Sequence, residues 1–481
     1  MGENNSKFFF VLLSVCTTIG IGNLWLYPYF SFKLTGLFFI PYLTALVLFG
    51  MPMIMLEISI GQYFSKNVVD LFGSIKKWIG GVGWLMVINA FILMSVYAAV
   101  LSWHIIYIFV SFGLQWKNDA NSYLFSNVLQ ASQFNGSFAQ FSLPVFIALI
   151  AAWVLIFFYI RKGIEGIKKW FLATSIIFVL LMFWFMLYSL TLDNALAGVY
   201  FFLKPRFKSL LNFRVWLDAF ALAAMSLGIS FGAMTAFARK SKGFVAGSSF
   251  AVALFKLLTS ISIGFIVFSM LGFLSLKNGI VLKDSSLPDS SFPFATLAQA
   301  LPFFYKPVVS SLLFFIFLAI FFIFGTAALA YSVSNVLAHK LDTKQRNAAV
   351  VVCGCGFLFG LLFVIKPGFY IMDIAIHFFY YNVLIVVLLE ALAVGWFFNA
   401  DKLSEYISYH SFLKIGKLWK VLVKYFVPLI VLVLLFFQAK SDLLLNYKNY
   451  PLWALLAFGI GFVVIPIIAA FLLPQRMLDR R

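Results

Sequence analysis

Charged residues are scarce in this sequence, and acidic residues are scarcer than basic ones. Only 11% of the 481 residues are charged while 63% are hydrophobic, and 16 aspartates and glutamates stand against 35 lysines and arginines. A soluble chain of this length needs far more charge to cover its surface. The composition therefore excludes an ordinary soluble protein and indicates an integral membrane protein.

Cysteine and histidine are also rare, with three and four copies. Cys16 lies in the first apolar segment, and Cys353 and Cys355 lie together in a late one, so we expect no structural disulfide. His104 and His377 have no partners at metal-ligand spacing in the sequence. No nucleophile–base constellation or phosphate-binding loop is recognisable, which argues against an enzyme.

Apolar runs of about 18–25 residues, the length that crosses a bilayer as a helix, recur along the whole chain. They predict an all-α polytopic membrane protein with about 12 transmembrane helices in a single domain, 1–481. The predicted spans lie near residues 8–33, 36–64, 82–113, 142–160, 165–190, 215–238, 244–274, 306–338, 347–365, 369–398, 418–437 and 453–473.

The net charge of +19 indicates membrane topology rather than nucleic-acid binding, because the basic residues sit in short loops between apolar runs. With the N-terminus inside, 22 of the 35 lysines and arginines fall in cytoplasmic segments. This bias predicts that both termini are cytoplasmic, although the basic loop 204–214 lies on the opposite side. We expect a multi-pass protein of a cell membrane, such as a bacterial inner membrane, with the lipid bilayer and no nucleic acid as partner.

Small and polar residues interrupt two of the predicted spans near their middle. Residues 14–23 read SVCTTIGIGN, and residues 225–232 read MSLGISFG. Glycine inside a helix costs about 1 kcal/mol relative to alanine, so both segments predict a break. Unwound backbone persists in hydrocarbon only where protein satisfies it or where it lines a cavity. Close helix packing through small residues is the alternative for either segment taken alone.

The two predicted breaks are five spans apart, and this spacing has a consequence for the topology. Because five is an odd number, the second block of five spans is inverted relative to the first. The pattern predicts two inverted five-helix repeats, 8–190 and 215–398, followed by two accessory helices at 418–473. Such repeats are typical of secondary transporters that bind their solute near the bilayer midplane.

Residues 20–28, GIGNLWLYP, resemble the signature of the neurotransmitter:sodium symporters, the family of the bacterial leucine transporter. The similarity continues through Gly36, 40–42 and 56–62, and it resumes at 161–168, 203–205, 215–217, 231–234 and 394–396. It covers nearly the whole chain. The resemblance implies two inverted repeats plus two helices, with helices 1 and 6 broken, and it implies sodium-coupled uptake of a solute.

The resemblance also implies a site for a first sodium ion, here called the first sodium site. The family builds it from span one, span six, span seven and the carboxylate of the substrate. Thr18, Asn23 and Ser226 match its ligands, but the position of the span-seven asparagine is Lys256. Oxygen ligands of the kind that hard cations prefer therefore remain, though fewer than usual.

A second sodium site is implied between spans one and eight. The carbonyls of Cys16, Ile19 and Ile323 and the hydroxyl of Thr326 match the family pattern, whereas Ala327 occupies the position of a second hydroxyl. Sodium is therefore the expected coupling ion, and we expect no other cofactor.

The substrate site implied by the resemblance is formed by Thr17, Thr18, Gly20 and Gly22 of span one, Tyr97 of span three, and Met225, Gly228, Ser230 and Phe231 of span six. Gly20 stands where the amine-selective members carry aspartate, which favours an amino acid over a monoamine. Tyr97 would donate its hydroxyl to the carboxylate of that substrate. A packing or interfacial tyrosine is the alternative interpretation.

Other positions depart from the family pattern. The arginine of the outer gate is Leu26, so its ion pair with an acidic residue of span ten, for which Asp373 is the nearest candidate, cannot form. The glutamine that helps to hold chloride in animal members is Leu222, although Tyr42 and Ser260 are present. We therefore do not expect full chloride dependence.

Lys256 places a charge in the middle of a span, which costs about 2.5–3.5 kcal/mol on insertion scales. We hypothesise that its ammonium sits where the first sodium ion would, as a tethered cation, and that loss of its proton during the cycle makes transport partly proton-coupled. The alternative is an ion pair with a fixed carboxylate. Glu57 is expected to satisfy backbone N–H groups of unwound chain, and Glu390 is assigned no role.

These features predict a secondary-active symporter of an amino acid or similar small carboxylate solute, working by alternating access. The solute would bind between spans one, three, six and eight. The alternative is a non-transporting solute sensor with the same fold, which the missing gate residues and thinned sodium ligands motivate.

Overall fold

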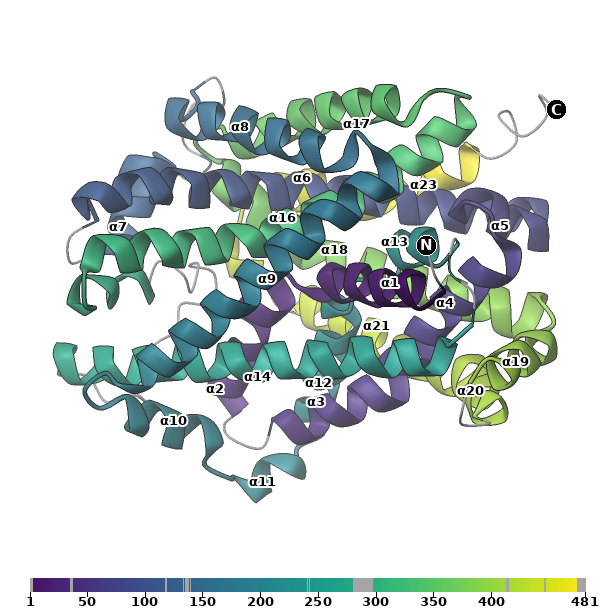
Figure 1. Cartoon of the computed structure of the whole chain (residues 1–481), viewed down its shortest axis with the longest axis horizontal. Coiled ribbons are helices and arrows are strands. Elements are labelled where there is room, and N and C mark those ends of the chain that lie inside the picture. The colour runs from purple at the N-terminus through teal and green to yellow at the C-terminus, as the bar shows by residue number, and fades with distance from the viewer. Residues whose placement is uncertain are drawn as a thin grey trace.

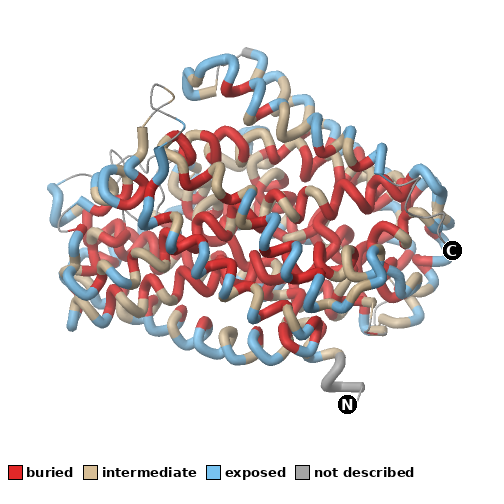
Figure 2. Tube along the Cα trace, turned by 90° about the horizontal axis from the view of Figure 1, so that it is seen from above, coloured by how far each residue is buried: buried red, intermediate tan, exposed pale blue. Residues whose placement is uncertain are grey.

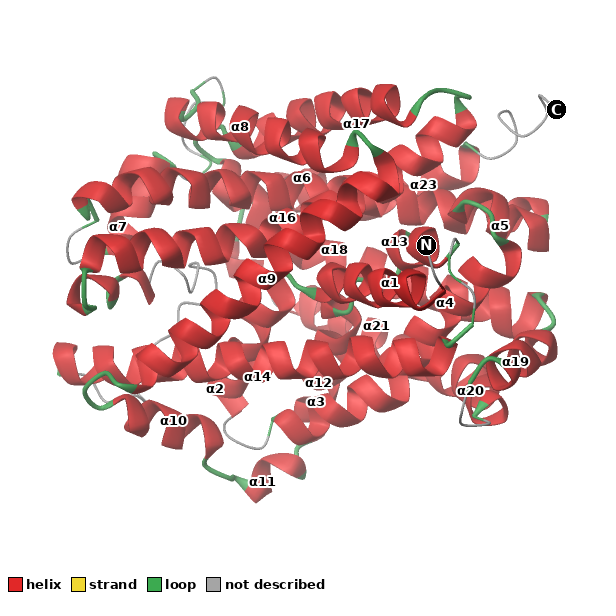
Figure 3. Cartoon of the chain, in the orientation of Figure 1, coloured by secondary structure: helices red, strands yellow, loops and turns green. Residues whose placement is uncertain are grey.

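The structure is a computed structural model of the chain. It describes residues 3–34, 38–116, 119–132, 134, 138, 140–239, 241, 243–279, 297–411, 415–444 and 447–473. These ranges are helical almost throughout (Figure 3), and their one strand-like pairing is an isolated antiparallel bridge between Phe141 and Ile365. The predicted all-α fold class is confirmed.

Among the residues that the structure describes, ten segments are long and apolar enough to cross a membrane. The first six are α3 (Phe39–Ala45) with η2 (Leu46–Gly50) and α4 (Met51–Phe64); η3 (Lys77–Ile79) with α6 (Gly80–Val110) and η4 (Ser111–Gly113); α8 (Leu143–Ile160); α9 (Gly163–Leu190); α14 (Val245–Asn278); and α16 (Pro307–Lys340). The other four are α17 (Gln345–Gly360) with η7 (Leu361–Phe363); α18 (Gly368–Leu392) with η8 (Ala393–Phe397); α20 (Gly416–Val421) with η9 (Leu422–Phe426) and α21 (Val427–Leu444); and α22 (Leu452–Ala454) with η11 (Leu455–Ile460) and α23 (Gly461–Leu472).

The two remaining predicted spans are the ones that the sequence predicts to be broken. The first consists of α1 (Glu3–Thr18) and a second arm, η1 (Gly22–Leu26) with α2 (Tyr27–Leu34), and it bends by 55°. Counting this pair as one span gives 11. The second consists of α12 (Phe213–Ser226) and α13 (Ala233–Ala238), which are too short to cross a membrane singly. The count of 12 stays a prediction.

Short helices connect the long ones along the chain. They are α5 (Val68–Ile75), α7 (Ala120–Tyr123), η5 (Leu124–Val128), α10 (Ala195–Leu203), α11 (Phe207–Leu210), η6 (Leu301–Phe303), α19 (Ala400–Tyr409) and η10 (Tyr447–Asn449). Figure 1 shows α7 and α10 at one end and α5, α19 and α20 at the other. We call these the α10 end and the α5 end. In the predicted topology the α10 end faces outward and the α5 end faces the cytoplasm.

The bundle is layered, with its most buried helices in the middle. In the membrane-crossing stretch of α6, 83% of residues are buried, against 22% in α9 and 22% in the last span. Figure 2 shows the same gradient, with buried chain through the centre and exposed chain at the rim. The outer helices expose apolar faces, which suit contact with lipid. In a membrane no hydrophobic effect forces such faces together. The inner helices surround the two broken helices, which lie where solvent and lipid are excluded.

Candidate functional site

The first broken helix unwinds over a very short segment. α1 stops at Thr18, residues 19 and 20 lie outside any helix, and the π-helical turn η1 follows. The carbonyl of Gly20 accepts hydrogen bonds from the N–H groups of Asn23 and Leu24, at 3.0 and 3.4 Å. Two glycines in the run GIG weaken the helix here and add no side chain to fill the bend, which explains the break.

The second broken helix unwinds over residues 227–232, between α12 and α13. Three of these residues, Gly228, Ser230 and Gly232, have φ angles of 67°, 71° and 70°, in the left-handed region. Glycine adopts that region without strain, whereas a serine there must be held by its surroundings. The alternation of glycine and serine in SLGISFG therefore suits a loop better than a helix.

The two breaks touch each other at glycines. A Cβ built on Gly22 would lie 2.1 Å from the Cβ of Ser226, and one built on Gly228 would lie 2.7 Å from the carbonyl oxygen of Thr17. No larger residue fits at either position without moving the backbone. Small-residue packing, the alternative interpretation of these segments, is thus present together with the breaks rather than instead of them.

A small cavity of about 20 Å³ lies between the two breaks, α6 and α16. Its lining residues are Thr17, Thr18, Gly20, Gly22, Leu93, Tyr97, Met225, Ser226, Gly228, Phe231, Gly325, Ala328 and Leu329. They include every predicted substrate residue except Ser230. A cavity of this size holds about one water molecule, so the site is closed in this conformation.

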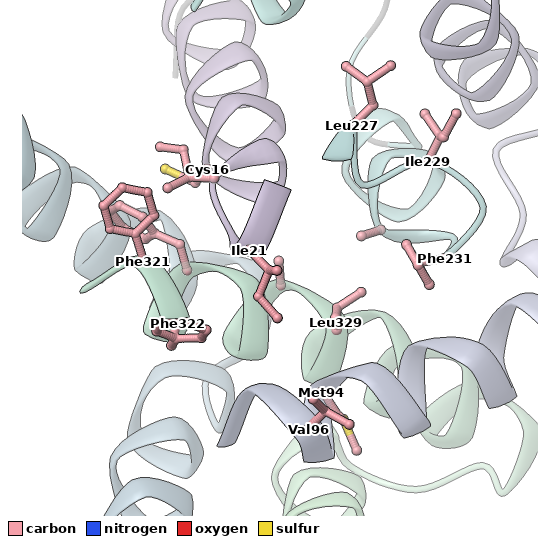
Figure 4. Packing of buried hydrophobic residues seen from close by; sticks show 14 of the residues in the cluster. Cys16, Ile21, Met94, Val96, Leu227, Ile229, Phe231, Phe321, Phe322 and Leu329 are labelled. Atoms are coloured by element: carbon pink, nitrogen blue, oxygen red, sulfur yellow. The ribbon is translucent and has the colours of Figure 1, made fainter. Parts of the chain in front are cut away.

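Apolar side chains form much of the cavity wall, and the sequence had not pointed to several of them. Figure 4 shows Ile21 at the bend of the first broken helix, Met94 on α6 and Leu329 on α16, all members of one buried hydrophobic cluster. Leu93 and Leu329 line the cavity itself. They are ordinary core residues in pattern, and only the packing of α6 against α16 brings them to the breaks.

Tyr97 of α6 connects the packed core to the unwound backbone. Its ring packs edge-on against Phe322, with ring centroids 5.8 Å apart. Its hydroxyl is hydrogen-bonded to the backbone of Ile21, and a Cβ built on Gly20 would lie 2.9 Å from it. Tyr97 is thus a packing residue through its ring, while its hydroxyl lies at the cavity, where it can contact a ligand.

Ser230 turns away from the cavity and toward two buried carboxyl groups. Its backbone N–H donates to Glu57 Oε1 at 2.5 Å, and its hydroxyl donates to Glu390 Oε2 at 3.5 Å. The expectation that Glu57 satisfies unwound backbone is confirmed. Glu390 was missed, although a carboxylate inside a span is itself a signal, because its partner lies 160 residues earlier in the chain.

Lys256 of α14 reaches the first break. Its ammonium donates to the carbonyl oxygen of Thr18 at 2.9 Å and to Asn23 Oδ1, and the side chain is fully buried. Asn23 in turn donates to the backbone oxygen of Lys256 at 3.4 Å and to Ser260 Oγ at 3.1 Å. Within the described ranges no carboxylate oxygen lies within 4.0 Å of the ammonium, so the alternative of a fixed ion pair has no partner there.

The ammonium therefore uses oxygens that the resemblance assigns to the first sodium site. Thr18 and Asn23 supply two of its expected ligands, and both already accept hydrogen bonds from Lys256. Two unit charges 4 Å apart repel each other by about 4 kcal/mol at an effective dielectric constant of 20. The oxygens of Thr18 and Asn23 thus suit the Lys256 ammonium, and they do not suit a sodium ion bound beside it.

The elements of the second predicted sodium site adjoin each other without such a competitor. The carbonyl oxygen of Ile19 points toward α16, 3.8 Å from a Cβ built on Gly325. Thr326 is buried and donates its hydroxyl proton to the carbonyl of Phe322 at 2.6 Å, which leaves its oxygen as an acceptor. Cys16 and Ile323 are buried on the same two helices, and Ala327 adds no oxygen.

A larger cavity of about 340 Å³, here called the vestibule, lies on the α10 side of the breaks. Gly22, Leu93, Tyr97, Met225 and Phe231 line both this cavity and the small one. These residues therefore form the partition between the two.

The two residues at the predicted positions of the outer gate, Leu26 and Asp373, both line the vestibule. Leu26 lines it where the family carries arginine, and Asp373, also in its wall, instead receives hydrogen bonds from Lys448 at 3.0 Å and Tyr450 at 2.9 Å. The acidic residue is instead tied to the accessory helices.

His377 has a polar partner that the sequence did not reveal. Its Nε2 lies 2.9 Å from Asp442 Oδ1 of α21, and its ring stacks on Tyr447 with centroids 3.8 Å apart. Tyr381 also donates to Asp442, at 2.7 Å. The partners are more than sixty residues apart in the chain, so local spacing could not find them.

Tyr42 and Ser260, the two positions that the resemblance associates with chloride, are joined by a side-chain hydrogen bond near Asn23. Tyr42 and Ser226 lie 3.4 Å apart, and Ser260 accepts from Asn23 at 3.1 Å. Leu222 is buried, lines the vestibule, and brings no hydrogen-bond donor.

Comparison with known proteins identifies the family. The model of the sodium:neurotransmitter symporter family matches residues 2–139 and 115–478. A protein of Methanocaldococcus jannaschii named as an uncharacterized sodium-dependent transporter is 30% identical over 475 residues, covering 96% of each chain. The human sodium- and chloride-dependent GABA transporter 2 is 26% identical over 94% of this chain and 83% of its own length. The sodium-dependent nutrient amino acid transporter 1 of Drosophila erecta is 24% identical over 94% of this chain and 81% of its own.

These matches agree with the broken helices, the buried oxygen ligands and the apolar spans. The family consists of sodium-coupled membrane transporters rather than enzymes. The chain belongs to the sodium:neurotransmitter symporter family.

Proposed function

We propose that this protein is a sodium-coupled symporter of an amino acid or a similar small carboxylate solute, working by alternating access. The observation that carries the proposal is the closed cavity between the two breaks, separated from the vestibule by a partition of Tyr97, Met225 and Phe231. A site that is closed to one side by a thin wall is what alternating access requires.

The substrate class follows from the groups at the first break. Gly20 has no side chain, and the Tyr97 hydroxyl occupies the space where one would begin. A family member with an acidic residue there can hold an amine, whereas this cavity offers a hydroxyl and the nearby Lys256 ammonium. Both favour a solute that carries a carboxylate. Relatives named as GABA and nutrient amino acid transporters are consistent with this class.

Binding requires the small cavity to expand. A volume of about 20 Å³ accommodates one water molecule and not an amino acid. We expect the partition side chains to swing toward the vestibule when solute enters, and α1 and α13 to move at the α5 end when it leaves. The breaks supply the hinges, because an unwound backbone can change its φ and ψ angles without breaking helix hydrogen bonds.

Sodium is the proposed driving ion, through the second sodium site, and chloride is not required because Leu222 lacks the donor of the chloride-binding members. Both termini are proposed to be cytoplasmic, from the charge bias of the loops. The hypothesis that protons also take part stays a prediction, which uptake measured across a pH gradient tests.

The test is uptake by the purified protein in proteoliposomes, with each standard amino acid as radiolabelled probe. An inward sodium gradient should accumulate at least one of them above its external concentration, and a sodium ionophore should abolish the accumulation. The rival function, a solute sensor, predicts saturable binding with no accumulation under any gradient. A protein that binds none of these solutes would contradict both.

A further inference from the structure

The strongest departure of this chain from its family is a lysine at a sodium site. We infer that the Lys256 ammonium is a fixed cation that replaces the first sodium ion, receives the carboxylate of the solute, and leaves one sodium ion per protein. The part concerning the solute rests on the proposed function, whereas the part concerning sodium does not.

The first argument is the ligand set. The ammonium donates hydrogen bonds to a freed backbone carbonyl, that of Thr18, and to the amide oxygen of Asn23. The distance of 2.9 Å to Thr18 is typical of a hydrogen bond from a charged nitrogen to oxygen. These are neutral oxygens at an unwound helix, which is the environment that a sodium ion would need. Lys256 supplies the same charge at the same place by covalent attachment.

The second argument is charge balance. The ammonium is fully buried, and its contacts in the described part of the chain are all to neutral oxygens. A buried charge without a counter-charge is costly, and an anion that arrives with the solute relieves that cost. An ammonium has three donors, of which two have acceptors here. The third is available for a carboxylate oxygen.

The third argument is position. Thr18 and Ser226 line the small cavity and also take part in the network around Lys256, directly or through Tyr42. A solute in this cavity therefore has its carboxylate end beside Thr18, between the Tyr97 hydroxyl and the ammonium. A solute without a carboxylate would leave the ammonium uncompensated, so the lysine selects for the acid group.

The test counts sodium ions directly. Equilibrium binding of radioactive ²²Na⁺ to the purified, detergent-solubilised protein should give one ion per wild-type chain. Lys256→Asn restores the amide of the family and should bind one more ion than the wild type. Lys33→Asn removes a lysine that lines the vestibule away from the first break, so its stoichiometry should equal that of the wild type. Size-exclusion chromatography checks that each variant is folded.

The outcomes separate cleanly. Any wild-type stoichiometry other than one overturns the inference, and this measurement needs no substitution. If Lys256→Asn is folded and binds no additional ion, the inference is also wrong; if it does not fold, Lys256→Gln takes its place. The second sodium site takes no ligand from the solute, so the wild-type count of ²²Na⁺ needs no solute. A wild type that binds one ion yet transports no amino acid would therefore contradict the proposed function and leave the sodium part of the inference standing.

Discussion

The two broken helices are chemically opposite, although each interrupts a span at the same depth of the fold. At the first break, the freed carbonyl of Thr18 meets a positive side chain, Lys256. At the second, the freed N–H of Ser230 meets a negative one, Glu57, with Glu390 beside it. Unwinding exposes acceptors at one end of a half-helix and donors at the other, and each is matched by the side chain of complementary charge.

The difference lies in what the partner replaces. Glu57 supplies a structural partner for the backbone on the side of the second break that is turned from the cavity, where Ser230 lies. Under the inference above, Lys256 occupies oxygens that would otherwise bind a mobile sodium ion. At the second break, a side chain of the protein satisfies the backbone and stabilises the fold. At the first break, a side chain takes the predicted place of a sodium ion.

The largest effect is expected where the breaks touch. Gly228→Val puts a branched side chain at φ 67° and 2.7 Å from the Thr17 carbonyl. Left-handed strain of about 1–3 kcal/mol adds to overpacking of similar size, so sodium-driven uptake should be lost. Gly354→Ala is the matched control, because a Cβ there meets nothing within 4 Å, and it should transport like the wild type. Normal uptake by Gly228→Val would mean that the two breaks do not pack as described.

The second break is probed by Glu57. Glu57→Ala leaves the Ser230 N–H buried without an acceptor, which should lower the stability by about 1–3 kcal/mol. Glu57→Gln keeps an acceptor oxygen and should lose much less. The thermal unfolding midpoint of each variant in detergent measures the difference. If both variants unfold at the same temperature, the carboxyl group does not complete the break through this hydrogen bond.

A smaller effect is expected at the second sodium site. Thr326→Ala removes one of the predicted oxygen ligands, worth about 1 kcal/mol, and should raise the half-saturating sodium concentration for uptake by about fivefold. Ala327→Ser restores the missing hydroxyl and should lower that concentration. Sodium titrations of initial uptake rates decide the matter. An unchanged sodium titration in both variants would show that the driving ion binds elsewhere.

The smallest effect is expected from chloride. Replacing chloride by gluconate on both sides of the membrane should leave sodium-driven uptake unchanged, because Leu222 provides no donor for the anion. A Leu222→Gln variant, which adds the donor of the animal members, is the informative comparison. Loss of wild-type uptake in gluconate would show that Tyr42, Ser226 and Ser260 bind chloride on their own.

Much of this architecture could be predicted from the residues. Ten spans follow from apolar runs, and both breaks follow from glycine clusters that weaken a helix whatever surrounds it. The role of Glu57 followed from the cost of burying a carboxylate without a donor. These features depend on local sequence and on general costs.

The contacts between distant segments could not be predicted in the same way. Lys256 and Thr18 are 238 residues apart, and nothing local to either indicates their hydrogen bond. Ser230 is turned away from the cavity and has a left-handed φ angle, which the sequence does not specify. The second broken helix does not form one long helix, because residues 227–232 between α12 and α13 are unwound.

The ratio of sodium to solute carried in one cycle tests the central claim most directly. In proteoliposomes, the solute gradient that just balances a known sodium gradient gives this ratio at zero net flux. A protein whose first sodium ion is replaced by Lys256 should show one sodium ion per solute molecule. A ratio of two would contradict the account, because both sodium sites would then carry mobile ions.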